Sequence, residues 1–271
     1  METVKAAPFD PHELVNRFAR TAKHQGFRAE PIAEIDGCPL IALTRRTAGP
    51  RPRIYLSSGV HGDEPAAPLA LLELLERGVF DARAVWFLVP MLNPSGFPRG
   101  LRENRAGIDL NRDYRNPASK EVSAHVKWLE HQPLFDLSFC LHEDWESTGF
   151  YLYELNPLAR ASLAGLIIDA VGSAHPIDHA TEIDGRPAKG GIIRPNDDPA
   201  SRERWPEAVY LRANHTTLSY TLEAPSGFPL AERVAMHVLA VETALNHFLR
   251  QSGSAIQKSL EPNHRLSPRP R

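Results

Sequence analysis

The segment SSGVHGDEPAAPLALLELLE, residues 57–76, places an imidazole and a carboxylate in the turn between an apolar strand and a helix. His61 follows the strand, Glu64 comes three residues later, and Pro65 precedes a leucine-rich helical pattern. One interpretation is helix capping, with Asp63 as the cap and Glu64 in the favourable field of the helix N-terminus. The other is a metal site, because imidazole and carboxylate groups are common metal ligands. The choice between them depends on partners elsewhere in the chain.

Strand-like and helix-like patterns alternate along most of the chain. Short apolar segments rich in β-forming residues predict strands at 51–60, 84–92, 134–144, 149–155 and 215–225, and a hairpin that turns at Asp36-Gly37. Helical patterns fall at 11–25, 65–80, 120–132, 158–174 and 229–251. This alternation predicts an α/β layered fold with a largely parallel sheet, in one domain over residues 1–250. Residues 251–271 lack periodicity, so we expect a mobile tail there.

The composition of the 271 residues is that of an ordinary globular protein, with 42% hydrophobic and 24% charged residues. A net charge of −2 gives no sign of a nucleic-acid-binding surface. No apolar run approaches the roughly 20 residues of a membrane span, and the N-terminal segment lacks the apolar stretch of a signal peptide. We therefore expect a cytoplasmic protein without nucleic acid or membrane partners, and the oligomeric state stays open. We expect Cys38 and Cys140 to be buried thiols rather than a disulfide or a thiolate metal site.

Four acidic or imidazole side chains fall at the ends of predicted strands. They are His61 and Glu64 after the first central strand, His142 in LHED, and Glu223 in TLEAP. Ligands in α/β sheets bind at the carboxyl ends of the strands. Two imidazoles and one carboxylate form the ligand set of a catalytic zinc that keeps a position open for water. Zinc lowers the pKa of that water to about 7, and a carboxylate outside the metal shell, for which Glu223 is the candidate, would carry the proton.

At this point the chain resembles the zinc carboxypeptidase family, over about residues 53–248. The resemblance is carried by the motifs HGDE (61–64), NPSGF (93–97), LRENRAGIDLNRDY (101–114), LHED (141–144) and TLEAP (221–225), which follow the order of the family. It implies a three-layer α/β/α fold, with a mixed, largely parallel twisted sheet and helices on both faces. In size the chain is nearest to the bacterial murein peptide amidases. A more distant likeness is to the aspartoacylase and succinylglutamate desuccinylase group.

The resemblance implies roles for five residues around a zinc ion. His61, Glu64 and His142 would be the zinc ligands, and Glu223 would act as general base and then as general acid. Arg102 would polarise the scissile carbonyl and hold the developing oxyanion.

The resemblance also implies a site for the substrate carboxylate. Asn111 and Arg112 would bind it, through a neutral donor and a bidentate guanidinium respectively. Members of the family usually present a mobile tyrosine over the substrate, and Tyr210 is the only tyrosine in the corresponding region. Arg112 could instead pair with Asp109 or Asp113 in a purely structural role.

Two acidic neighbours of His142 have two possible roles. Glu143 and Asp144 could orient its imidazole from outside the metal shell, or could be solvated loop charges. The side-chain pocket for the substrate must be lined from residues 175–214.

That segment carries both signs of charge. Asp197 and Asp198 would favour a basic substrate side chain, whereas Arg194, Arg202 or Arg204 would favour an acidic one.

The predicted function is zinc-dependent hydrolysis of an amide bond next to a free carboxylate, in a small peptide or an acyl-amino acid. The first interpretation is a metallocarboxypeptidase, and this includes one that acts on cell-wall peptides. An N-acyl amino acid deacylase of the aspartoacylase or desuccinylase type is the alternative, although those relatives usually carry an added C-terminal β domain. A non-catalytic carboxylate-binding module is the third, and it would have no need of Glu223.

Overall fold

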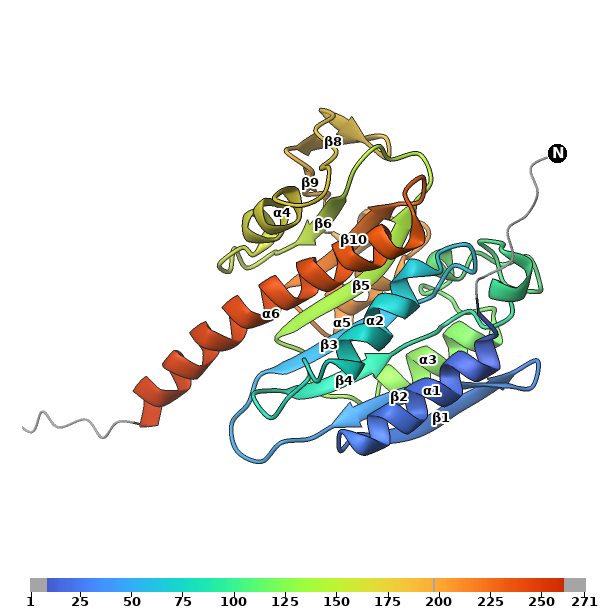
Figure 1. Ribbon diagram of the computed structural model, residues 1–271, viewed down its shortest axis with the longest axis horizontal. Coiled ribbons are helices and arrows are strands. Elements are labelled where there is room, and N and C mark those ends of the chain that lie inside the picture. Colours follow the sequence, from blue (N-terminus) through green and yellow to red (C-terminus); the bar gives the residue numbers. More distant parts are fainter. Residues whose placement is uncertain (1–8, 197, 261–271) are drawn as a thin grey trace, which may run out of the picture.

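The structure, a computed structural model, describes residues 9–196 and 198–260 and has an α/β fold built on one ten-stranded sheet (Figure 1). The strands are β1 (Arg28–Ile35), β2 (Cys38–Arg45), β3 (Arg53–Ser58), β4 (Val85–Val89), β5 (Leu137–Asp144), β6 (Tyr151–Leu155), β7 (Glu182–Ile183), β8 (Arg186–Lys189), β9 (Ile192–Ile193) and β10 (Ser219–Pro225). The helices are α1 (Pro11–His24), α2 (Ala66–Glu76), α3 (Lys120–Leu129), α4 (Ala164–Gly172), α5 (Glu207–Asn214) and α6 (Leu230–Leu260), with short 3-10 turns η1 (Phe97–Arg99), η2 (Leu110–Arg112) and η3 (Pro199–Ser201).

The sheet is mixed, and its centre is parallel. The strand order is β1-β2-β4-β3-β5-β10-β6-β9-β8-β7. The four central strands β4, β3, β5 and β10 run parallel, whereas β1, β2 and β6 join antiparallel. Because parallel strands end at the same edge, the carboxyl ends of β3, β5 and β10 lie together.

Helices cover both faces of the sheet, which confirms the three-layer architecture. Helices α1, α2, α4 and α6 pack on one face, and α3 and α5 lie behind the other (Figure 1). Each face has its own apolar core. Strand β3 shows how the alternation of side chains divides them: Ile54 and Leu56 enter the core under α2 and α6, and Tyr55 enters the core under α3 and α5.

Local signals account for the first helix and the first hairpin. The Asp10 side chain accepts hydrogen bonds from the backbone amides of His12 and Glu13, so it caps α1 as expected. Asp36 and Gly37 both adopt positive φ angles, 50° and 81°, in the tight turn between β1 and β2.

The turn that contains HGDE is held by a close approach to the NPSG segment. A Cβ atom on Gly62 would lie only 2.2 Å from the carbonyl carbon of Gly96, so the two backbones pack directly against each other. Asp63 does not cap α2, however, although the capping interpretation of this turn requires it. Helix α2 begins at Ala66 without a side-chain cap from its own turn, and the Ala66 amide donates instead to Glu143, which comes from the end of β5.

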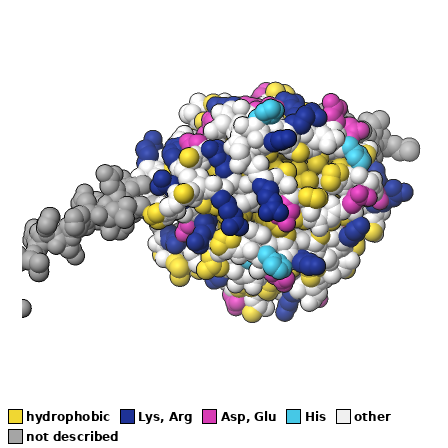
Figure 2. Space-filling model, turned by 90° about the horizontal axis from the view of Figure 1, so that it is seen from below, with side chains coloured by type: hydrophobic (Ala, Val, Ile, Leu, Met, Phe, Trp, Pro, Cys, Tyr) yellow, Lys and Arg dark blue, Asp and Glu magenta, His cyan; other side chains and the backbone are white. Residues whose placement is uncertain are grey.

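The C-terminal helix runs further than the predicted domain. Helix α6 continues to Leu260, past the expected boundary at residue 250. The rest of the predicted tail, 261–271, lies outside the described residues, and the division into one domain and a tail stays a prediction. Within the described residues, no helix has the length and apolar character needed to cross a membrane. On the face shown in Figure 2, basic, acidic and hydrophobic side chains are interspersed.

Candidate metal centre and its cleft

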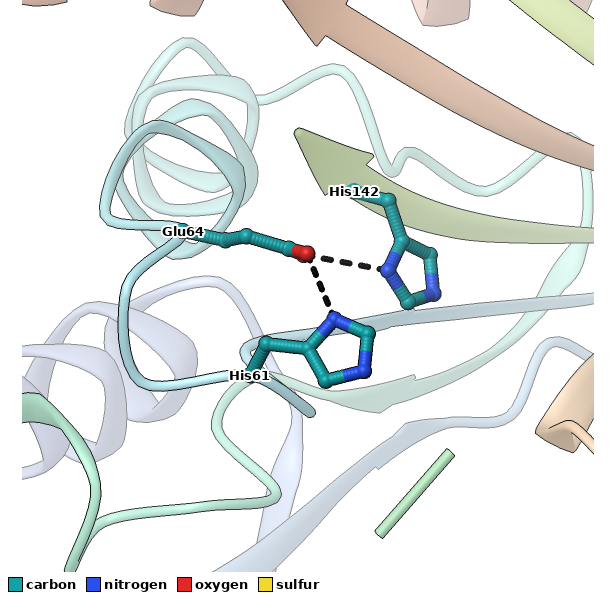
Figure 3. Close-up of side chains that lie close together, drawn as sticks. All are labelled: His61, Glu64 and His142. Carbon is teal, nitrogen blue, oxygen red and sulfur yellow. Dashed lines mark hydrogen bonds and ion pairs between the residues drawn. The ribbon is translucent and has the colours of Figure 1, made fainter. Parts of the chain in front are cut away.

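His61 and Glu64 from one turn converge with His142 from the end of β5 at the carboxyl edge of the sheet (Figure 3). Glu64 lies between the two imidazoles: its Oε1 is 2.5 Å from Nδ1 of His61, and its Oε2 is 3.0 Å from Nδ1 of His142. One ligand atom from each residue lies within 4.8 Å of the others. All three are buried, with 1%, 3% and 3% of their surfaces exposed for His61, Glu64 and His142.

The chemistry of this group fits a divalent cation. Two imidazole nitrogens and a carboxylate oxygen are close enough to share one ion, and this donor set suits zinc. Burial by itself would raise the pKa of Glu64, but the neighbouring His61 and His142 outweigh burial and hold that pKa well below its usual value. The carboxylate is therefore ionised in a buried place, where a positive charge stabilises it.

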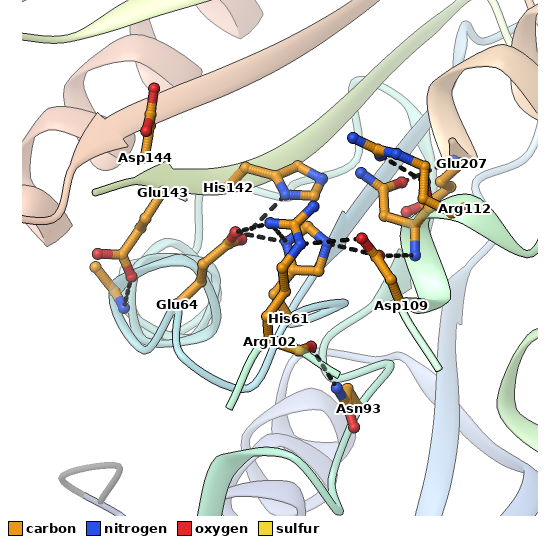
Figure 4. Close-up of polar contacts among 12 residues, drawn as sticks. His61, Glu64, Asn93, Arg102, Asp109, Arg112, His142, Glu143, Asp144 and Glu207 are labelled. Atoms are coloured by element: carbon orange, nitrogen blue, oxygen red, sulfur yellow. Dashed lines mark hydrogen bonds and ion pairs between the residues drawn. The ribbon is translucent and has the colours of Figure 1, made fainter. Parts of the chain in front are cut away.

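Asp109 and Arg102 form a second layer around His61 (Figure 4). Nε2 of His61 lies 3.2 Å from Asp109 Oδ1, and Asp109 Oδ2 accepts a hydrogen bond of 3.0 Å from Arg102 Nε. A carboxylate on the outer nitrogen of a metal-binding imidazole fixes the tautomer and the orientation of the ring. The sequence motif does not reveal this role of Asp109, which depends on a contact across 48 positions of the chain.

Arg102 also reaches the metal-binding group. Its terminal nitrogen Nη1 lies 3.8 Å from Glu64 Oε1 and 3.3 Å from Nδ1 of His61. Burial would lower the pKa of Arg102, but Asp109 and Glu64 raise it above its usual value, so the guanidinium stays charged. This position puts a fixed positive charge beside the candidate ion.

Glu143 and Asp144 have neither of the two roles considered for them. Glu143 Oε1 accepts a hydrogen bond of 2.5 Å from the Ala66 amide, and its other oxygen pairs with Arg233. Asp144 accepts a hydrogen bond of 2.9 Å from the hydroxyl of Tyr151. Glu143 therefore connects α2, β5 and α6 behind the site, and both side chains are turned away from the imidazole of His142 in Figure 4.

Glu223 lies beside the metal-binding group and has a different environment from Glu64. It is the register partner of His142 on the neighbouring parallel strand, and it lines the cleft. It is 9% exposed, and its carboxyl makes no hydrogen bond within residues 9–196 and 198–260. Burial raises the pKa of Glu223 well above its usual value, although His142 opposes this shift.

A cleft of about 680 Å³ opens over these residues. Its floor continues along β10 and β6, because Tyr151 is the register partner of Glu223, and Tyr153 that of Thr221 two positions earlier. All four side chains line the cleft. The two tyrosines were not expected from the sequence, since the order of strands that places β6 beside β10 has no local signal.

Among the arginines that line the cleft, three from separate segments lie close enough to affect one another's charge: Arg112, Arg186 and Arg202. Burial first, and then the charges of Arg186 and Arg112, lower the pKa of Arg202. Arg186 lies 4.0 Å from Asp184, which also accepts a hydrogen bond from Tyr153. Arg202 has no carboxylate partner among the residues that the structure describes.

The two residues expected to bind a substrate carboxylate lie in the cleft. The Asn111 side-chain oxygen accepts a hydrogen bond of 2.9 Å from the Glu207 amide. The Arg112 guanidinium is exposed and donates to the Asn111 carbonyl at 2.8 Å. Arg112 pairs with neither candidate structural partner: Asp109 bonds to Arg102, and Asp113 accepts hydrogen bonds from the amides of residues 118 and 119.

The position of Tyr210 disagrees with the role expected for it. It lies in α5, is 8% exposed, and packs in the core with its ring centroid 5.8 Å from that of Tyr114. It does not line the cleft, because its ring packs in the apolar core on that face of the sheet, against Tyr114 and His215. Asp197, one of the residues considered for the side-chain pocket, lies outside the described residues.

Comparison with known proteins supports the resemblance to the carboxypeptidases and the likeness to the aspartoacylase and succinylglutamate desuccinylase group. Residues 50–181 match the family described as the succinylglutamate desuccinylase/aspartoacylase catalytic domain. No curated protein matches the chain significantly. A candidate metallopeptidase from Shewanella amazonensis SB2B is 24% identical, with a TM-score of 0.77 over 88% of this chain and 93% of that one.

Two carboxypeptidase structures are also similar. The metallo-carboxypeptidase from Burkholderia cenocepacia is 20% identical, with a TM-score of 0.66 over 86% of this chain and 68% of that one. The metallo-carboxypeptidase from Pseudomonas aeruginosa, in complex with (2-guanidinoethylmercapto)succinic acid, is 20% identical, with a TM-score of 0.63 over the same shares of the two chains. The fold is thus that of the metallo-carboxypeptidases, and residues 50–181 are similar to the catalytic domain of the succinylglutamate desuccinylase and aspartoacylase family.

Proposed function

We propose that this protein is a zinc-dependent hydrolase that cleaves an amide bond next to a free carboxylate. The observation that carries the proposal is the convergence of His61, Glu64 and His142 beside the unbonded carboxyl of Glu223. A metal-binding group and a free proton acceptor on one cleft wall are the two parts that amide hydrolysis by water needs.

The zinc would be held by His61, Glu64 and His142, with Asp109 orienting the first imidazole from behind. When bound, zinc lowers the pKa of a water molecule to about 7 and polarises a carbonyl oxygen. Glu64 and Asp109 each interact with Arg102 as well, so the side chains around the ion form one connected group.

Glu223 suits the role of proton carrier. No hydrogen bond ties up its carboxyl, and burial raises its pKa, so the group can both take a proton and return it to a leaving amine. Arg102 would provide the positive charge for the developing oxyanion, since its guanidinium lies beside Glu64 and stays charged.

Asn111 and Arg112 would hold the substrate carboxylate. The backbone amide of Glu207 donates to the side-chain oxygen of Asn111, so the NH2 group of Asn111 is left to donate to the substrate. The Arg112 guanidinium has no acidic partner among the described residues and faces the same cleft. Together they offer a neutral donor and a charged one to a single anion.

The arginines of the cleft favour a substrate with an acidic side chain. Arg202 has no carboxylate partner in the described part of the chain, and burial first, and then its neighbours Arg186 and Arg112, lower its pKa. A second carboxylate on the substrate would relieve this repulsion. Arg202 and Arg204 are therefore the sequence candidates that line the cleft, whereas Arg194 does not line it and pairs with Glu154.

An acidic preference supports the deacylase alternative. The catalytic-domain match is to enzymes named for succinylglutamate and for an acylated aspartate, and the Pseudomonas aeruginosa neighbour holds a succinic acid derivative. Removal of an acyl group from an acidic amino acid and removal of an acidic residue from the end of a peptide use the same two anion contacts. They differ only in the group on the other side of the amide.

A hydrolysis panel tests the function. Zinc-loaded wild type and Glu223→Gln are assayed on N-acetyl and N-succinyl amino acids, and on dipeptides, with acidic, apolar and basic residues carrying the free carboxylate. We expect cleavage by the wild type, strongest for the acidic residues, and a loss of about 10²–10⁴-fold in Glu223→Gln. A wild type that binds zinc and cleaves none of these compounds would instead support a carboxylate-binding module.

A further inference from the structure

A buried chain of four polar side chains lies beneath the segment that holds Asn111 and Arg112. We call it the buried column, and it consists of Tyr114, His125, Tyr55 and Glu207. Tyr114 Oη lies 2.8 Å from Nδ1 of His125, Nε2 of His125 lies 2.9 Å from Tyr55 Oη, and Tyr55 donates to Glu207 at 2.7 Å. Each of the four is at most 1% exposed, so none of them can touch a substrate.

The chemistry of the buried column assigns the position of every proton. Tyr55 uses its only proton for Glu207, so its oxygen must accept one from Nε2 of His125. Burial lowers the pKa of His125 to about 3, so the ring is neutral and its Nδ1 accepts from Tyr114. With Glu207 ionised, these roles give each of the three contacts of the column one donor and one acceptor.

Both ends of the buried column reach the segment that binds the carboxylate. At one end, Glu207 is the first residue of α5, and its backbone amide donates to the Asn111 side-chain oxygen at 2.9 Å. At the other end, Tyr114 follows Arg112 by two positions in the chain. The column thus connects α5 to this segment through the apolar core under α3 and α5.

A buried carboxylate is costly, so a column of this kind needs a reason other than stability. Apolar side chains of the same volume would fill the space at equal or lower free energy. What an apolar filling cannot do is hold the first turn of α5 at a fixed distance from Tyr55. That distance decides whether the Glu207 amide meets the Asn111 side chain.

We propose that Glu207, His125 and Tyr55 are positioning residues for the substrate carboxylate. They hold α5 so that its first amide donates to the Asn111 side-chain oxygen. This hydrogen bond directs the NH2 group of Asn111 to the cleft. This inference rests on the proposed function, because it assumes that Asn111 and Arg112 bind an anion there.

The test removes one hydroxyl from the buried column. In Tyr55→Phe the link between His125 and Glu207 is lost and the ring is kept. Tyr220→Phe is the matched control: Tyr220 is also fully buried and donates to a buried glutamate, Glu154, at 2.9 Å, but its hydroxyl bonds to Glu154 and Leu163 rather than to α5. Calorimetry measures the binding of N-acetylglutamate to the zinc-loaded proteins, each carrying Glu223→Gln so that the ligand is not cleaved. Kinetics of the proteins with Glu223 intact measure KM and kcat on the best substrate and its carboxamide analogue.

We expect Tyr55→Phe to weaken N-acetylglutamate binding and raise KM by about tenfold, because small displacements of a binding group have effects of this size or larger. The change in kcat should be less than about threefold, the carboxamide analogue should be unaffected, and Tyr220→Phe should bind like the wild type. Glu207→Gln, whose amide oxygen still accepts from Tyr55, should bind much better than Glu207→Leu. Equal affinities in wild type and Tyr55→Phe would overturn the positioning role alone. No binding to the wild type would overturn the proposed carboxylate site and the positioning role together.

Discussion

Glu223 and His142 are register partners on the parallel strands β10 and β5, so a free carboxyl and a candidate metal ligand emerge side by side from the same edge of the sheet. Their environments differ in one respect that decides their chemistry. His142 contacts the ionised Glu64, whereas the Glu223 carboxyl has no hydrogen-bond partner in the described residues. One strand pair thus supplies both a fixed ligand and a group free to exchange a proton.

The anchor for the substrate carboxylate is tested by Arg112→Ala. We expect KM for a substrate with a free carboxylate to rise, because the variant loses a hydrogen bond to a charged group. Such a bond usually contributes about 1.5–3 kcal/mol to the binding free energy. A carboxamide analogue should be indifferent to the change. Steady-state kinetics on the two substrates measure the difference.

Arg105→Ala is the matched control for that variant, because Arg105 is 76% exposed and pairs with Asp36 at 3.6 Å. Its kinetics should equal those of the wild type. Equal losses in Arg112→Ala on both substrates would remove Arg112 from the anion site.

The carboxylate behind His61 is tested by Asp109→Asn. The variant keeps the shape of the side chain and loses the charge that orients the imidazole, so zinc affinity should fall by about 10–100-fold. Asp113→Asn on the same loop is the control, since Asp113 bonds to the amides of residues 118 and 119 instead. Competition with a chelating dye measures both affinities. An unchanged affinity in Asp109→Asn would show that the contact with His61 has no role in metal binding.

The pair of Glu143 and Arg233 is predicted to stabilise the fold behind the site. Arg233→Met leaves a buried carboxylate without its partner, which costs about 3–5 kcal/mol of unfolding free energy. Replacing both residues, as in Glu143→Leu with Arg233→Met, should recover much of that loss. Urea unfolding of the single and double variants measures it, and a single variant as stable as the wild type would show that the pair is not coupled to folding.

Stability at acid pH should depend on His125. Its pKa is about 3 in the folded protein, against an ordinary value of 6.5, because burial disfavours the charged ring and His215 adds a smaller effect in the same direction. The unfolded chain therefore takes up the proton first as the pH falls below 6.5, and the stability contributed by the neutral ring is lost progressively between 6.5 and about 3.

The variant His125→Gln isolates this effect from other titrating groups. Between pH 6 and pH 4, the wild type should lose stability relative to the variant by about 1.4 kcal/mol per pH unit. Urea unfolding at several pH values measures the difference. A difference that does not change with pH would mean that His125 is not held neutral.

The parts of the site that follow strand ends were predictable from the sequence. His61, Glu64, His142 and Glu223 come together because parallel strands place their carboxyl ends at one edge, whatever the loops between them do. Residues whose roles depend on packing between distant segments were not predictable. Glu143 caps a helix from another strand, and no local pattern indicates this.

The orientation of a short helix was equally hidden. Tyr210 looked available to the substrate because it is the only tyrosine upstream of Glu223 in its region. Its position on α5 places its ring in the apolar core under α3 and α5, and the tyrosines that line the cleft come from β6 instead. Strand order and helix rotation are tertiary properties, which a single sequence expresses only weakly.

Zinc stoichiometry tests the central claim most directly. After loading and dialysis, mass spectrometry should find one zinc per chain in the wild type and in His131→Ala, a control in which an exposed histidine that bonds to the Lys127 carbonyl is removed. His61→Ala, Glu64→Gln and His142→Ala should each retain much less than one. A wild type without bound zinc, or a His142→Ala variant that keeps its full complement, would contradict the claim that these three side chains share one ion.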